Sequence, residues 1–113
     1  MTDAPIDLDV LNELKDATGA EFAAELVNTF LDEAPGMMTE LKTALANGDA
    51  EGYRRAAHSL KSNASTFGAT LLSEKAREIE VGELPASDDP ADAEALQIAL
   101  DSAGAALRDL INA

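Results

Sequence analysis

Residues 56–69 read AAHSLKSNASTFGA and contain the only histidine of the chain, His58. A helix turns by about 100° per residue, and on such a helix the apolar side chains of this region fall opposite His58. They are Tyr53, Ala56, Leu60, Ala64 and Phe67. A continuous apolar stripe is typical of an amphipathic helix. We therefore predict a helix over about 50–67, with the stripe in the core and His58 in water.

Basic and hydroxyl side chains surround His58 on the polar face of this predicted helix. Those within roughly 60° of the histidine are Arg54, Arg55, Lys61, Ser62 and Ser65. The chain has only 8 basic residues against 22 acidic ones, so three basic side chains near one imidazole concentrate positive charge. This charge favours an anion beside the ring, and we interpret the face as a site for holding a phosphoryl group.

A single histidine has other common roles. Many lone histidines are surface residues without a special function, and this interpretation stays open. A core position is disfavoured, because burying His58 would expose the apolar stripe. A zinc site needs several histidine or cysteine ligands, and the chain has no cysteine and no second histidine, so we predict no metal site.

The composition limits the remaining classes of function. A chain of 113 residues has the usual size of one domain, and we assign residues 1–113 to a single domain. The net charge of -14 would repel nucleic acid and anionic membrane surfaces, so we expect neither as a partner. No segment approaches the roughly 20 apolar residues of a membrane-spanning helix. Cysteine is absent as well, and together these two features favour a cytoplasmic protein.

The rest of the chain also has helical patterns. Abundant alanine and an aromatic content of 4% favour helices over strands. Apolar spacing, with caps and stops at Asp, Gly and Pro, predicts helices over about 8–17, 20–47 with a kink near Pro35, 70–81 and 90–112. In the second of these we expect Phe22, Leu26 and Phe30 to point inward. The short connections favour an all-α, antiparallel up-down-up-down four-helix bundle with a short extra N-terminal helix.

The stretch HSLKSNASTFGA resembles the signature of the histidine-containing phosphotransfer (HPt) domains of bacterial multistep phosphorelays. That signature is His, any residue, Leu or Ile, Lys, Gly, two small residues, two variable ones, an apolar residue, Gly, and Ala or similar. The matching residues are His58, Leu60, Lys61, Ala64, Phe67, Gly68 and Ala69, while Ala57 and Gly48-Asp49 also fit. The sequence departs at Ser62, where the family has glycine, and at Asn63. A looser resemblance extends from about Phe22 to Glu80.

The resemblance implies a phosphoryl carrier and not an enzyme. His58 would accept a phosphoryl group from a receiver-domain aspartyl phosphate, or from a histidine kinase, and pass it to another receiver-domain aspartate. Lys61, Ser62 and Ser65 are suited to contact the phosphoryl oxygens. The residues expected to face the partner are Arg54, Arg55, Ala57, Gly68 and Ala69.

The expected partners are response-regulator receiver domains and a histidine kinase or hybrid kinase. The resemblance assigns Mg²⁺ to the receiver domain, so we expect no cofactor in this chain, which we predict to be monomeric. No GxxxxGK[ST] loop is present, and we expect no phosphorylation from ATP by the chain itself. The alternative function is a non-phosphorylated helical adaptor or inhibitor that docks on a kinase or receiver domain.

Overall fold

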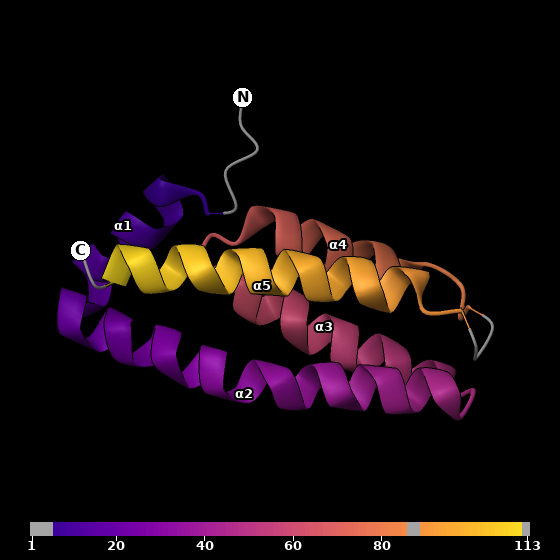
Figure 1. Cartoon of the computed structure of the whole chain (residues 1–113). Helices are drawn as coiled ribbons and strands as arrows, with labels where there is room; N and C mark the ends of the chain where they lie inside the picture. Colours follow the sequence, from indigo (N-terminus) through magenta and orange to yellow (C-terminus); the bar gives the residue numbers. More distant parts are fainter. Residues whose placement is uncertain (1–5, 86–88, 112–113) are drawn as a thin grey trace.

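The computed structural model describes residues 6–85 and 89–111, and this part of the chain is all-helical. The helices are α1 (Leu8–Thr18), α2 (Ala20–Ala46), α3 (Ala50–Thr66), α4 (Thr70–Val81) and α5 (Ala91–Ile111). Helices α2 to α5 form an antiparallel bundle in which α3 packs against both α2 and α4, and α5 closes the bundle against the same two helices (Figure 1). The short helix α1 lies at one end of the bundle. The predicted fold class is confirmed.

The helix ends follow the predicted caps. Carboxylate oxygens of Asp7, Asp49 and Asp89 accept hydrogen bonds from backbone N–H groups in the first turns of α1, α3 and α5, at 3.0 to 3.1 Å. Each observed helix limit lies within one residue of its predicted position, and residue 112 of the predicted last helix lies outside the described residues. Capping carboxylates and well-placed glycines are local signals, which explains this agreement.

Helix α2 continues through Pro35. Proline has no N–H to donate to the carbonyl of the residue four positions earlier, so one helical hydrogen bond is missing there. The ribbon of α2 changes direction near the middle of its length (Figure 1). Helix α2 is therefore one long helix with an interruption near Pro35.

The beginning of α2 differs from the predicted inward face. Phe22 is 51% exposed, whereas Ala23 and Val27 are fully buried and lie on the same side as Phe30. Residues eight positions apart differ by about 80° around a helix, and residues seven positions apart by only about 20°. The prediction that Phe22 points inward was wrong because it followed successive steps of four.

The apolar stripe of α3 forms the centre of the core. Tyr53, Leu60 and Ala64 are at most 1% exposed, and the ring of Phe67 stacks on that of Phe30 with centroids 5.5 Å apart. Burial of this stripe fixes the rotation of α3 about its own axis. The opposite face of α3, which carries His58, is consequently directed to solvent.

The turn between α3 and α4 is also closely packed. Gly68 has a φ angle of +75°, and its carbonyl accepts a hydrogen bond from the backbone N–H of Asp7 at 2.6 Å. A Cβ atom at this position would lie 2.6 Å from the Asp7 carbonyl oxygen. Glycine is needed here both for the backbone conformation and for the close approach of the N-terminal segment.

Candidate functional site

His58 lies in the middle of α3, and its side chain is 58% exposed. The predicted orientation of α3 is correct, since the apolar stripe on the other side of the helix is buried. Exposure alone does not distinguish a functional histidine from an ordinary surface residue. The hydrogen bonds of the ring describe its surroundings further.

Glu80 of α4 holds His58 and Lys61 together. One carboxylate oxygen, Oε2, lies 2.6 Å from Nδ1 of His58, and the other, Oε1, accepts a hydrogen bond from Nζ of Lys61 at 2.5 Å. The side chains of Glu80 and Lys61 are only 23% and 28% exposed. The three side chains thus form a partly buried ion-pair network beside the imidazole.

The charge state of Glu80 determines the tautomer of His58. The hydrogen bond from Lys61 and, to a lesser extent, that from His58 hold the pKa of the Glu80 carboxyl below its usual value, although partial burial acts in the opposite direction. An ionised carboxylate only accepts hydrogen bonds, so Nδ1 carries the proton in the neutral ring. The unprotonated Nε2 then has a free lone pair on the side of the ring away from Glu80.

Arg54, one turn before His58, also contacts the end of α4. Its Nη2 donates a hydrogen bond to the carbonyl oxygen of Gly82 at 3.2 Å. This side chain is exposed, but it is engaged within the domain and is not simply directed toward a partner.

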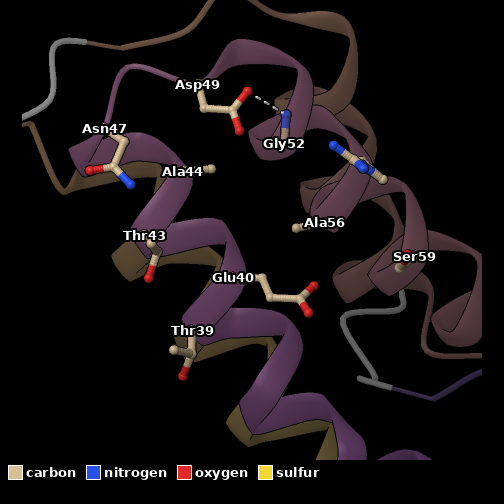
Figure 2. A pocket seen from close by; sticks show the side chains of 10 residues that line it. Thr39, Glu40, Thr43, Ala44, Asn47, Asp49, Gly52, Ala56 and Ser59 are labelled. Carbon is tan, nitrogen blue, oxygen red and sulfur yellow. Dashed lines mark hydrogen bonds between the residues drawn. The ribbon is translucent and has the colours of Figure 1, made fainter.

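On the other side of the histidine helix, a groove of about 550 Å³ separates α3 from the C-terminal half of α2 (Figure 2). Threonine, serine and asparagine side chains line it together with charged groups. Its lining residues include Thr39, Glu40, Thr43, Asn47, Arg55 and Ser59. Figure 2 shows Glu40 extending from α2 toward α3. Arg55 and Ser59 lie about 60° and 100° around α3 from His58, in the direction away from the side chains that contact α4, so the groove is a polar hollow on the α2 side of the histidine helix.

Comparison with protein families matches residues 25–112 to the Hpt domain. This match covers most of the chain and includes the whole network of His58, Lys61 and Glu80. The chain belongs to the Hpt domain family. Hpt domains are phosphocarriers, so the exposed histidine belongs to a domain with a phosphotransfer role in two-component signalling.

Individual relatives agree with this assignment. The chain is 33% identical over 78 residues to the sensor protein TorS of Escherichia coli (strain K12), and the match spans 69% of this chain but 8% of TorS. The crystal structure of the histidine-containing phosphotransfer protein B (HptB) from Pseudomonas aeruginosa PAO1 is 27% identical, with a TM-score of 0.87 and coverage of 98% and 97% of the two chains. The HPT domain of a sensor hybrid histidine kinase from Shewanella shares the fold, with a TM-score of 0.76 at 18% identity over 96% and 95% of the chains.

The two predicted serine contacts lie at different distances from the histidine of this Hpt domain. Ser62 is exposed one turn after His58. Ser65 lies seven residues after His58, which corresponds to roughly 10 Å along the helix axis. Its hydroxyl is 2.9 Å from that of Ser73 in α4. Ser65 is therefore removed from the set of residues expected to contact a phosphoryl group on His58.

Three residues predicted to face a partner are buried. Ala57 and Ala69 have no exposed surface, and Gly68 is buried under the N-terminal segment. Ala57 lies about 100° from His58 around α3, on the side covered by α4. The expectation for Ala57, Gly68 and Ala69 is corrected, and their match to the family signature reflects packing in this structure. Arg54 and Arg55 are exposed.

Glu80 was not among the residues predicted for the site. The only local signal is its position next to Ile79, which points inward and is 4% exposed. A residue adjacent to the core of α4 lies at the edge of the interface with α3.

Among the described residues no group of three potential metal ligands is found, and no helix in that part is long and apolar enough to span a membrane.

Proposed function

We propose that His58 is the phosphoacceptor, receiving a phosphoryl group from the aspartyl phosphate of a receiver domain or from a histidine kinase and passing it to the aspartate of another receiver domain. The observation that carries this proposal is the hydrogen bond between Nδ1 of His58 and Glu80. It leaves Nε2 unprotonated and accessible, which is the state that an imidazole needs to act as a nucleophile.

The transfer step uses the Nε2 lone pair. This nitrogen forms a bond to phosphorus while the bond between phosphorus and the aspartate oxygen of the donor breaks, which returns a free carboxylate to the donor. The ring becomes positively charged as the new bond forms, with the proton still on Nδ1. The Glu80 carboxylate stabilises this charge through the existing hydrogen bond, in the way that a carboxylate supports a catalytic histidine in hydrolases.

Lys61 supplies positive charge next to the reacting atoms. In the unphosphorylated domain its ammonium group donates to Glu80. A phosphoryl group on Nε2 brings about two negative charges to the same face, and one further donor of the ammonium group is then available to its oxygens. Ser62 adds a hydroxyl donor on the same face. The domain provides positioning and charge, which is most of what phosphoryl transfer requires.

The partner is proposed to approach from the side of α2. Glu80 of α4 contacts His58 on one side, and the groove between α2 and α3 lies on the other side of the histidine helix. A receiver domain seated over this groove would contact Arg55 and Ser59 while its aspartyl phosphate reaches Nε2. The Mg²⁺ that the receiver requires belongs to that partner. A monomeric, cytoplasmic domain is the form in which we propose that it acts.

The test is transfer between purified proteins. A receiver domain is phosphorylated with a small-molecule donor, freed of that donor and mixed with the wild-type chain or with His58→Gln. In a parallel reaction, a histidine kinase and ATP replace the phosphorylated receiver domain. We expect an acid-labile, base-stable phosphoryl adduct on the wild type and none on the variant. Binding of either partner without any adduct would instead support the adaptor function.

A further inference from the structure

Three side chains along one stripe of α3 hold the last turn of α4. Arg54, His58 and Lys61 are spaced by four and three residues, so they lie on the same face. Arg54 donates to the Gly82 carbonyl at 3.2 Å, and the other two contact Glu80. Assuming the proposed phosphoacceptor function of His58, we propose that Arg54 is a positioning residue, whose bond to Gly82 holds the end of α4 so that Glu80 meets Nδ1 of His58.

The end of α4 has few other anchors. Of its last three residues only Ile79 is buried, whereas Val81 is 68% exposed. The final turn contains no basic residue to interact with its free carbonyl groups. Helix ends without such partners open more easily than helix centres. The bond from Arg54 joins the backbone of Gly82, two residues beyond Glu80, to the second turn of α3.

Gly82 is suited to receive this bond. Its N–H donates to the Glu78 carbonyl at 3.1 Å, and a Cβ atom on Gly82 would lie 2.9 Å from the same oxygen. A side chain at this position would therefore displace the backbone that carries the acceptor carbonyl. Gly82→Ala should weaken the contact from the side of α4, independently of any change at Arg54.

The position of Arg54 on the surface predicts a local effect. Surface hydrogen bonds of this kind contribute little to global stability, so replacement of Arg54 leaves the domain folded. It allows the last turn of α4 to move, and Glu80 then spends less time at hydrogen-bonding distance from Nδ1. The population of the tautomer with a free Nε2 lone pair falls, and with it the rate of phosphoryl acceptance.

The experiment measures tautomer and rate without any protein partner. Ring ¹⁵N chemical shifts of His58 give the fraction protonated on Nδ1, and phosphoramidate serves as the phosphoryl donor. We expect Arg54→Met and Gly82→Ala each to lower the Nδ1-protonated fraction and to slow phosphorylation roughly three- to tenfold, the range that corresponds to the loss of one hydrogen bond. Arg54→Lys, which retains the charge and a donor, should restore part of the rate.

A double-variant cycle separates positioning from simple charge. In the background of Glu80→Ala there is no carboxylate to position, so Arg54→Met should cause no further decrease in rate. A decrease that is the same with and without Glu80 would overturn the inference and assign Arg54 a direct electrostatic role. An unchanged tautomer and rate in both Arg54→Met and Gly82→Ala would also overturn it. If the proposed function itself is wrong, phosphoramidate will not phosphorylate His58 of the wild-type chain. This result is different from the two that would overturn the role of Arg54.

Discussion

The carboxylate of Glu80 lies 2.6 Å from Nδ1 of His58, although the two residues are on different helices and 22 positions apart in the chain. This contact gives the exposed imidazole a defined tautomer and a nearby negative charge. Lys61 completes the network by binding the second carboxylate oxygen. The site therefore depends on the relative rotation of α3 and α4 as much as on the histidine itself.

Replacement of Glu80 by glutamine should slow phosphorylation of His58 by about tenfold or more. The amide has no negative charge to stabilise the imidazolium, and its NH₂ group favours the wrong tautomer by donating to Nδ1. Rates with phosphoramidate provide the measurement. The matched control is Glu78→Gln, which removes an exposed carboxylate of α4 that pairs with Lys75. Equal rates for Glu80→Gln and the control would show that Glu80 does not assist the reaction.

The contribution of Glu80 to stability should disappear in acid. Its pKa is lowered in the folded state, chiefly by the hydrogen bond from Lys61, and in the unfolded chain the carboxyl has its ordinary pKa of about 4.3. The network therefore stabilises the fold fully above that ordinary value, and the stabilisation is lost as the pH falls through the lower folded-state pKa. Urea unfolding between pH 7 and pH 3 should show the wild type and Glu80→Gln converging. A difference that stays constant over this range would contradict the ionised network.

The packing of the N-terminal segment against the turn between α3 and α4 can be tested with two glycines. Gly48 and Gly68 both have positive φ angles, +67° and +75°, but only at Gly68 would a Cβ atom meet another residue. Gly48→Ala should cost about 1 to 2 kcal/mol from backbone strain alone. Gly68→Ala should cost more, because the contact with Asp7 must also open. Equal losses in free energy of unfolding would mean that the segment is not packed as described.

Blocking the groove between α2 and α3 should affect protein partners only. Thr43→Trp places a large side chain in the groove. The rate of transfer from a phosphorylated receiver domain should therefore fall by about tenfold or more. This decrease corresponds to the loss of an interface contact worth at least about 1.4 kcal/mol. Phosphoramidate needs no docking surface, and its rate should stay at the wild-type value. Thr29→Trp, at an exposed position of α2 outside the groove, is the control. Normal receiver transfer in Thr43→Trp would place the docking surface elsewhere.

The sequence predicted the helices and the orientation of α3 because those features have local causes. Caps and glycine stops occur within a few residues of the helix ends, and the stripe from Tyr53 to Phe67 lies within one helix and its C-cap. The error at Phe22 arose from the accumulated drift of a four-residue step around the helix. Helix geometry alone shows this drift, because Ala23 is seven positions before Phe30 and lies within about 20° of it.

The site was predicted in part for a similar reason. His58 and Lys61 are one turn apart on one helix, so their proximity follows from spacing. The contact with Glu80 requires the packing of α4 on α3, which no motif in the sequence specifies. Matching a signature also gave no information about exposure, and Ala57, Gly68 and Ala69 match it while being buried.

The position of the phosphoryl group on the imidazole tests the central claim most directly. The chain, uniformly labelled with ¹⁵N, is phosphorylated by a receiver domain, and ³¹P and ¹⁵N spectra identify the nitrogen bonded to phosphorus. We predict a single adduct on Nε2 of His58, with the proton on Nδ1 still hydrogen-bonded to Glu80. Phosphorylation on Nδ1, or on any residue other than His58, would contradict the account.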